Sequence, residues 1–438
     1  MRGTDSARTR RSFLAGMAGA VGGAIALSCG SGPAGRPATA GSAASKGGEV
    51  SFLDWEKIPG TPLEQAIQMF QKQTGTTVTV QPVPTTDYDT KMRTLLAGKV
   101  APDVMRINEY YIRGFSLDNA LMDLRPFMKK SGVDQSLLNP AMFRSPTQRN
   151  GKHTAWVIGS QASLIFYNVD LFKRAGVPLP PTTWSAKGWT WDDFLDKAKR
   201  LTVSGQRWGA LVYYSTFYEQ TFSVNNGSPT GIYSADATDL TLADPPGTKA
   251  VQWATDLTCV HKVQPPWSQL QQPNADLELF VQGKVAMLFE SMGIVPYLGA
   301  NANFTWDVAP PPANVHQMSE SKGIVFCIPK SAANPDHGWA LLNFLSSQRA
   351  GEVLAKGKQF TPINSKAAAM VKQDGHSPAH IELFAVAADH MTKATQPINT
   401  LGGRDIYRPA LQSTYNCEQP AQKVLSSVRG RVHTELKG

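Results

Sequence analysis

The residues of this chain that could carry out catalysis or hold a metal are few and widely spaced. His376 and His380 stand four residues apart, which would place two imidazoles on one helical face, but Pro378 between them favours the start of a helix. Asp192 and Asp193 could form a carboxylate pair of the kind that glycosidases use, yet acidic residues are common in the first turn of a helix. The chain has no HExxH, GxSxG or Gly-rich phosphate-loop motif. We therefore expect a protein without catalytic residues, cofactor or metal, with an exported carbohydrate-active enzyme as the alternative.

Three cysteines lie in the body of the chain, at Cys259, Cys327 and Cys417. None belongs to a CxxC pair, and no spacing between cysteine and histidine is typical of a zinc site. Because the number of thiols is odd, at most one disulfide forms among them. Two interpretations stay open: a bond between Cys259 and Cys417, or three buried thiols.

Cys29 is the residue whose chemistry would attach the chain to a membrane. A twin arginine, Arg10-Arg11, is followed by a Gly- and Ala-rich apolar stretch that ends directly before this cysteine. The arrangement resembles a twin-arginine export signal with a lipobox, although Leu27 stands one position later than is usual. The stretch is shorter than the roughly 20 residues that span a bilayer, so acyl chains on Cys29 would form the anchor. We expect residues 1–28 to be a twin-arginine-type lipoprotein signal peptide, with a plain cleaved signal as the alternative.

Composition predicts a flexible tether between the membrane anchor and the body, and it excludes nucleic acid as a partner. Residues 29–48 are rich in Gly, Ala, Ser and Pro, which predicts a flexible tether. The formal net charge is +9, and the basic residues are dispersed. Since a nucleic-acid partner would require a clustered basic face, we expect none. We expect a soluble, monomeric body that a lipid holds at the outer face of the cytoplasmic membrane.

The body alternates strand-like and helix-like segments. From residue 49 to 107 the order is strand, helix, strand, helix, strand, which predicts a parallel-type α/β sheet. Thr190 is a suitable N-cap for one of the helices, and the chain from about residue 364 onward is mainly helical. The predicted segments are strands at 49–55, 76–82, 101–107, 163–167, 285–289 and 323–328, and helices at 62–75, 87–96, 170–175, 191–201, 249–260, 276–282 and 336–346.

Several phrases of the sequence, taken in order, resemble the family 1 extracellular solute-binding proteins of ABC importers, the group that includes maltose-binding protein. The ordered set spans essentially the whole body. The phrases are Asp54-Trp55 with the later Thr-Gly-Thr-Thr-Val strand, Tyr88 to Lys99, Ala101-Pro102-Asp103-Val104, Leu164 to Asn168 with Ala175-Gly176-Val177-Pro178, Thr190 to Phe194, Phe280 to Met287, and Asn334-Pro335 with Trp339 to Phe344.

The resemblance implies an α/β fold of the type II periplasmic-binding-protein class, with two discontinuous lobes joined by a hinge. It implies an N-terminal lobe of residues 48–157 plus 323–363 and a C-terminal lobe of residues 158–322 plus 364–438. Ligands bind at the carboxyl ends of strands in open α/β sheets, and hinge closure would enclose a solute between the lobes. Such a protein would deliver its solute to the permease subunits of an ABC importer and would need no cofactor.

Within this fold, the candidate solute contacts are residues that follow strands or lie on the crossings between lobes. Aromatic rings stack on the apolar faces of a sugar, and a buried sugar hydroxyl left without a partner would cost roughly 1–3 kcal/mol. The mixture of aromatic, amide, hydroxyl and carboxylate groups therefore suits a carbohydrate. The candidates are Trp55, Glu56, Asn108, Tyr110, Tyr111, Ser160, Gln161, Phe217, Tyr218, Glu219, Asn226, Phe289, Glu290, Ser291, Lys322, Phe360 and Thr361.

The expected solute is a mono- or oligosaccharide, and a glycerol-phosphate-type or other polar solute is the alternative. Relatives often carry, at the position of Gly293, a Trp that stacks on the sugar, so another aromatic residue would have to replace it. Lys322 and Arg404 would favour an anionic solute if both point into the site. The residues that could replace the missing Trp are Phe289, Tyr297, Tyr110 and Tyr111.

Overall fold

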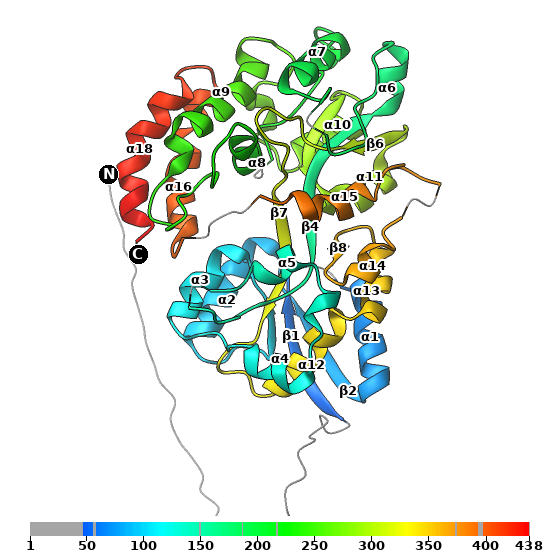
Figure 1. Cartoon of the computed structure of the whole chain (residues 1–438), viewed down its shortest axis with the longest axis vertical. Coiled ribbons are helices and arrows are strands. Elements are labelled where there is room, and N and C mark those ends of the chain that lie inside the picture. Colours follow the sequence, from blue (N-terminus) through cyan, green and yellow to red (C-terminus); the bar gives the residue numbers. More distant parts are fainter. Residues whose placement is uncertain are drawn as a thin grey trace, which may run out of the picture. The chain divides into compact units, whose positions relative to one another are not determined.

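The computed structural model describes residues 47–55, 58–148, 150–185, 187–215, 218–372, 375–392 and 397–437 (Figure 1). Cys29, the predicted signal peptide and nearly all of the predicted tether lie outside the described residues, as do two candidate contacts, Glu56 and Phe217. Among the residues that are described, no helix has both the length and the apolar character needed to cross a membrane.

The strands form one mixed sheet in the order β2-β1-β3-β7-β4-β5, and β6 and β8 also pair with β4. The pairs of β1 with β2 and with β3 are parallel, as predicted, whereas β7, β5, β6 and β8 pair antiparallel with their neighbours. The expectation of a parallel-type sheet therefore holds only for the first three strands. The strands are β1 (Gly48–Asp54), β2 (Thr76–Pro82), β3 (Val104–Arg106), β4 (Trp156–Asn168), β5 (Met287–Ser291), β6 (Trp306–Ala309), β7 (Ser321–Cys327) and β8 (Thr361–Pro362).

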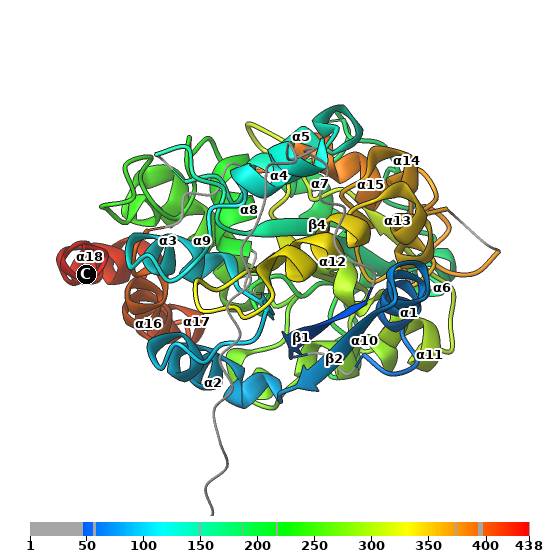
Figure 2. The same cartoon turned by 90° about the horizontal axis from the view of Figure 1, so that it is seen from below.

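One group of elements encloses a core cluster that includes Phe52, Trp156, Phe326 and Leu342, and we call this group the N-terminal lobe. Helices α1, α12 and α13 contact one another, and α12 also contacts β1 (Figure 2). The helices of this lobe are α1 (Pro62–Thr74), α2 (Thr85–Ala97), α3 (Glu109–Leu117), α4 (Arg125–Ser131), α5 (Pro140–Arg144), α12 (Pro335–Leu345), α13 (Gln348–Ala355) and α14 (Ser365–Ala368).

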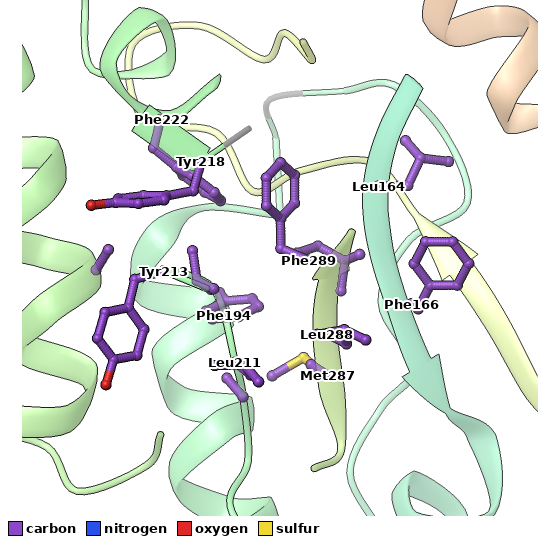
Figure 3. Packing of buried hydrophobic residues seen from close by; sticks show 14 of the residues in the cluster. Leu164, Phe166, Phe194, Leu211, Tyr213, Tyr218, Phe222, Met287, Leu288 and Phe289 are labelled. Atoms are coloured by element: carbon purple, nitrogen blue, oxygen red, sulfur yellow. The ribbon is translucent and has the colours of Figure 1, made fainter. Parts of the chain in front are cut away.

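A second core cluster, which includes Phe166, Phe194, Phe222 and Phe289, defines the C-terminal lobe (Figure 3). Its chain segments come from the middle and the end of the sequence, and α9 contacts both α8 and α18. The helices of this lobe are α6 (Val169–Arg174), α7 (Trp191–Leu201), α8 (Tyr218–Asn225), α9 (Pro245–Cys259), α10 (Ala275–Val281), α11 (Val295–Asn301), α15 (Leu383–Val386), α16 (Thr400–Ala410), α17 (Gln412–Tyr415) and α18 (Ala421–Glu435).

Helix α7 shows how local sequence signals set an element that the core then holds. The Thr190 side chain accepts a hydrogen bond from the Asp193 backbone, and the Asp193 carboxylate accepts one from the Thr190 backbone N–H at 2.8 Å. This capping box satisfies two N–H groups that the helix itself leaves unpaired. Phe194 and Leu201 are fully buried on the apolar face. Asp193 is thus a helix-capping residue, as the sequence indicated.

Strand β4 belongs to both lobes. Its residues Trp156–Ala162 pair with β7, and its residues Ser163–Tyr167 pair with β5. In Figure 1, β4 and β7 run between the elements of the two lobes, and we call them the crossing strands. The sequence predicted only the segment 163–167, because Gly159 and the polar residues after it interrupt the apolar pattern. Between residues 162 and 163, the strand that pairs with β4 therefore changes from β7 to β5 of the C-terminal lobe.

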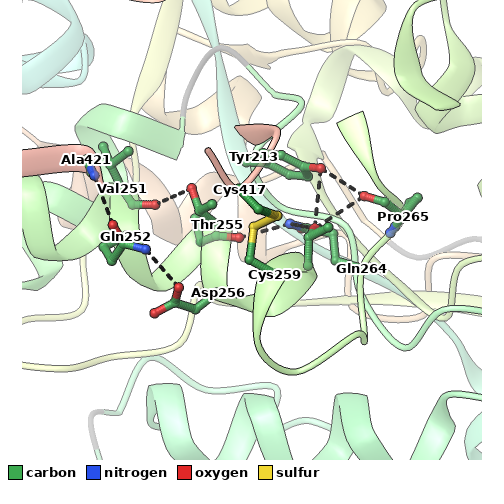
Figure 4. The surroundings of a disulfide bond; sticks show 12 residues. Tyr213, Val251, Gln252, Thr255, Asp256, Cys259, Gln264, Pro265, Cys417 and Ala421 are labelled. Atoms are coloured by element: carbon green, nitrogen blue, oxygen red, sulfur yellow. Dashed lines mark hydrogen bonds between the residues drawn. A yellow bond between two sulfur atoms is a disulfide. The ribbon is translucent and has the colours of Figure 1, made fainter. Parts of the chain in front are cut away.

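A disulfide joins Cys259 at the end of α9 to Cys417, which follows α17 (Figure 4). Of the two interpretations that the cysteine count left open, the bond between Cys259 and Cys417 is confirmed. Cys327, the third body cysteine, lies buried in the N-terminal core, and burial raises the pKa of its thiol to about 12. The covalent connection is therefore internal to the C-terminal lobe.

Candidate functional site

An aromatic ring lies against a buried ion pair at the carboxyl ends of β1 and β3. Asp54 and Arg106 lie 3.6 Å apart with side chains 0% and 5% exposed. The Arg106 guanidinium lies 4.5 Å from the ring centroid of Trp55, within the range of a cation–π contact. Tyr88 packs edge-on against Trp55 and donates its hydroxyl to the Arg106 carbonyl at 2.8 Å. These contacts fix the half-buried Trp55 ring directly after β1.

A small pocket lies beside this group, between the start of α1 and the crossing strands. On its rim, the Gln161 side chain on β4 donates to the Gln359 carbonyl at 3.0 Å. The hydroxyl of Thr361, which is buried on β8, contacts the sulfur of Met292 in the C-terminal lobe at 3.6 Å. The lining residues are Pro62, Leu63, Arg106, Ile324, Leu354, Gly357, Gln359 and Phe360.

Charged side chains of both lobes meet at Tyr110, in the first turn of α3. The ring centroid of Tyr110 lies 5.4 Å from the Lys322 ammonium on β7 and 5.8 Å from the Arg404 guanidinium on α16. Glu109 accepts a hydrogen bond from the Ser145 hydroxyl at 2.9 Å, and burial raises the pKa of its carboxyl although Lys322 opposes this. The N-terminal lobe, a crossing strand and the C-terminal lobe therefore supply charged groups to one place.

Glu219 lies in the same electrostatic neighbourhood but is already paired. Its fully buried carboxylate accepts two hydrogen bonds from Arg408, at 2.8 and 3.2 Å. Burial lowers the pKa of Arg408, but the charge of Glu219 outweighs it and the net pKa is raised. This fork-to-fork geometry is the strongest arrangement for such a pair. Glu219 thus connects α8 to α16 within the C-terminal lobe.

At the end of β5, the half-buried Glu290 interacts with the buried Asp276, and no cation of the described residues is among the groups that shift the pKa of either carboxyl. Burial raises the pKa of Glu290 to about 7, and the backbone N–H of Ser291, which donates to it at 2.7 Å, lowers it in part. Asp276 adds to the rise, and burial brings the pKa of Asp276 itself to about 6. Near pH 7 Glu290 is therefore present in protonated and ionised forms, and its protonated form can both donate and accept hydrogen bonds.

The other predicted contacts fall into core and loop positions. Tyr218 and Phe289 are 0% and 1% exposed and pack in the C-terminal core (Figure 3). The Tyr111 hydroxyl is held between Asp89 and Arg93. The remaining positions are Ser160, buried on β4, Asn108, half-buried at the N-cap of α3, and Asn226, whose amide bonds Pro246 and Asn314.

The Gln161 side chain lies close to Gly293, the position where relatives often carry a Trp. A Cβ atom built on Gly293 would lie 2.8 Å from Nε2 of Gln161. That approach is closer than carbon and nitrogen atoms tolerate, so the Gln161 side chain occupies the space that a larger residue would need. Trp55, which is stacked on Arg106 in the other lobe, is the half-buried aromatic ring that the structure offers instead.

Sequence reasoning missed four charged residues that the fold brings to this region: Arg106, Glu109, Glu320 and Arg408. Glu109 stands between two candidates, Asn108 and Tyr110, so its place at the start of a helix after a strand was a usable signal. Arg106, Glu320 and Arg408 had no such signal in the sequence, because their interaction partners are distant in sequence. The His380 imidazole lies 2.6 Å from Asp307, and in the described part of the chain no cluster of three His, Cys, Asp or Glu residues could hold a metal.

Comparisons with known proteins agree with this architecture. A family model described as bacterial extracellular solute-binding protein matches residues 54–352. The erythritol/L-threitol-binding protein of Mycolicibacterium smegmatis is 27% identical over 325 residues, which are 65% of this chain and 64% of that protein.

Two solved structures share the fold. The ABC substrate-binding protein Lmo0181 from Listeria monocytogenes, in complex with cycloalternan, has a TM-score of 0.79 and 22% identity and covers 88% of this chain and 98% of its own. UgpB from Mycobacterium tuberculosis, in complex with glycerophosphocholine, has a TM-score of 0.72 and 18% identity. The match covers 89% of this chain and 98% of UgpB. At these identities the likeness shows the two-lobe type II fold.

Proposed function

Because the chain belongs to the family of bacterial extracellular solute-binding proteins, which bind small solutes and work with ABC permeases, we propose that it captures a neutral carbohydrate or sugar alcohol between its lobes. The solute is then delivered to the permease subunits of an importer. Proteins of this family are substrate-binding components rather than enzymes. The finer parts of the proposal are the solute class, the residues that contact it and the lipid anchor.

The observation that supports the solute class is the presence, in both lobes and on the crossing strands, of aromatic and hydrogen-bonding groups. Trp55 and Tyr110 come from the N-terminal lobe, Gln161 from β4, and Glu290 and Ser291 from the C-terminal lobe. Half-buried aromatic rings suit the apolar faces of a sugar, and amide, hydroxyl and carboxyl groups suit its hydroxyls. The relative named for erythritol and L-threitol and the neighbour in complex with cycloalternan support a polyhydroxylated solute.

The proposed contact residues are candidates that lie beside the crossing strands or line the small pocket, together with Glu56 and Phe217, which lie outside the described residues. The lobes are proposed to comprise residues 48–157 plus 323–363 and residues 158–322 plus 364–438, although the short helix α14 packs on α13 of the N-terminal lobe. We propose that they close over the solute by rotation about the crossing strands. The proposed contacts are Trp55, Glu56, Asn108, Tyr110, Gln161, Phe217, Glu290, Ser291, Lys322 and Phe360.

A phosphate-bearing solute is the second candidate. Lys322 and Arg404 both lie near Tyr110, and a structural neighbour is in complex with glycerophosphocholine. Against this, Glu320 interacts with both of these cations, and Glu109 interacts with Lys322. A phosphate group would have to compete with these carboxyls for Lys322 and Arg404. The neutral solute is therefore the better fit.

A thermal-shift screen of the purified full chain tests the proposal. Ligands that bind the native state raise its stability by mass action, by about 2.7 kcal/mol at a hundredfold excess over Kd. Sugars and sugar alcohols should raise the melting temperature without being consumed, and glycerol 3-phosphate and glycerophosphocholine should not. Stabilisation by the phosphate esters alone would favour the second candidate. Turnover of a sugar, followed by chromatography, would favour the exported enzyme.

The anchor is proposed from Cys29, which precedes the described residues. Acyl chains on its thiol would hold the mature chain at the outer face of the cytoplasmic membrane. Membrane fractionation of cells that express Cys29→Ser should move the protein into the soluble fraction, whereas Cys327→Ser, a buried thiol in the body, should leave it with the membrane. A Cys29→Ser protein that still sediments with membranes would contradict lipidation.

A further inference from the structure

Glu320, the residue before β7, lies within electrostatic range of charged groups on four elements of both lobes. Its carboxyl interacts with Lys322 on β7, Glu109 on α3, Glu219 on α8 and Arg404 on α16. No other carboxyl described above interacts with charged groups on three helices and a crossing strand together. Glu320 therefore lies where movement of one lobe against the other would change its surroundings.

The backbone of Glu320 is fixed, while its side chain is not satisfied. Its N–H donates to the Thr221 hydroxyl at 2.9 Å, and its carbonyl accepts from the Ser163 N–H at 3.0 Å. The Oε2 atom of the carboxyl is buried, and within the described residues it has no hydrogen-bond partner. A buried polar atom in this state is unfavourable. Such an atom at the meeting point of two lobes has the properties expected of a group that a ligand completes.

We propose that Glu320 is a specificity-determining residue, whose carboxyl hydrogen-bonds one hydroxyl group of the solute and thereby joins the solute to crossing strand β7. This inference rests on the proposed function. It names a hydroxyl rather than a phosphate as the group bound here, because Lys322 and Arg404 already interact with the Glu320 carboxyl and Lys322 also interacts with Glu109.

The protonation of the carboxyl agrees with this role. Burial raises the pKa of Glu320 to about 8; Lys322 and Arg404 oppose the rise, and Glu109 and Glu219 add to it. Around neutral pH the group therefore carries a proton for much of the time. A protonated carboxyl both donates and accepts, as a hydroxyl does. A glutamine at this position retains one donor and one acceptor, whereas an alanine retains neither.

Isothermal titration of the purified full chain tests the inference, with erythritol, L-threitol, glucose, maltose, glycerol 3-phosphate and glycerophosphocholine as probes. For each neutral probe that binds the wild type, Glu320→Ala should weaken binding by more than tenfold. Glu320→Gln should stay within about threefold of the wild type. Glu418→Gln, a matched change at an exposed position of the C-terminal lobe, should have no effect.

A stability measurement separates this role from a structural one. At pH 9 the wild-type carboxyl is charged and buried, so the solute-free Glu320→Gln protein should melt at the same temperature as the wild type or higher. A lower melting temperature together with weaker binding would mean that Glu320 only supports the fold, and would overturn the inference.

The remaining outcomes also decide the question. Unchanged binding of a neutral probe by Glu320→Ala would overturn the inference and leave the proposed function intact. Binding of only the phosphate esters would overturn the hydroxyl assignment. If neither these probes nor any sugar or sugar alcohol of the thermal-shift screen binds the wild type, the proposed function fails, and the inference that rests on it fails too.

Discussion

The two lobes bury carboxyl groups beside the crossing strands in different ways. In the N-terminal lobe, Asp54 faces Arg106, and the Arg106 guanidinium stacks on the Trp55 ring. In the C-terminal lobe, Asp276 and Glu290 interact with each other, and burial raises the pKa of each. The first arrangement pairs opposite charges and holds an aromatic ring over the guanidinium. The second gives up charge and leaves polar groups whose hydrogen bonds can change.

The largest expected effect comes from removing one partner of the N-terminal pair. Asp54→Ala removes the carboxylate that faces the buried Arg106 cation, and breaking a buried ion pair in this way typically costs about 4 kcal/mol of folding free energy. Glu290→Gln, by contrast, replaces a buried carboxyl with a neutral amide and should cost less than about 1 kcal/mol at pH 8. Urea denaturation of both variants, followed by tryptophan fluorescence, measures the difference. Equal losses would mean that the two lobes do not differ in this respect.

The disulfide offers a second way to separate the lobes. The double variant Cys259→Ser, Cys417→Ser should lower the stability of the C-terminal lobe by about 3 kcal/mol, because the bond closes a long loop in the unfolded chain. Amide hydrogen exchange should show faster opening in α9 and α18 and unchanged exchange in β1 and β2. Cys327→Ser, which changes a buried thiol in the other lobe, is the control. If amide exchange became equally faster in both lobes, in the double variant and in Cys327→Ser alike, the lobes would unfold as one unit.

Trp55→Ala tests whether the aromatic ring over the guanidinium takes part in binding. It should weaken solute affinity by more than about tenfold, or 1.4 kcal/mol. Trp55→Phe retains a ring over Arg106 and should have a smaller effect. Titration with a solute found in the thermal-shift screen measures both. Wild-type affinity in Trp55→Ala would remove this residue from the proposed site.

The smallest effect concerns pH. Glu290 has a pKa near 7 in the folded protein and an ordinary value of 4.5 in the unfolded chain, so the folded state holds a proton that the unfolded state has lost. Its contribution to stability is therefore complete below about pH 4 and is lost as pH rises through 7. Relative to Glu290→Gln, the wild type should lose on the order of 1 kcal/mol between pH 5 and 8. Parallel stability curves for the two proteins would contradict the raised pKa.

Local elements could be predicted where the signals are local. The bounds of α7 followed from its capping residues, and β2 matches the predicted 76–82. The full length of β4 was missed because Gly159 is a position of close approach, where a Cβ atom would meet the Phe360 ring at 2.3 Å, rather than the end of a strand. The strand β6 has only four residues, too few to show a period.

The site was harder to predict than the elements around it. The spacing of strands and loops pointed to Trp55, Tyr110 and Lys322, but not to the charges that surround them. Glu320 and Arg404 act on each other from positions far apart in the sequence, and no periodicity connects such residues. Conversely, Tyr218 and Phe289 had suitable types and places in the chain, yet packing directs both into the core.

The place of β7 in the sheet has a consequence for the order in which the protein can be assembled. β7 lies between β3 and β4, although residues 321–327 are synthesised long after both. Until they emerge from the ribosome, the first three strands can pair only with one another and present an open edge at β3. Non-local pairing of this kind slows folding and exposes strand edges to aggregation. Nascent chains that stop before residue 321 should therefore lack a completed N-terminal lobe.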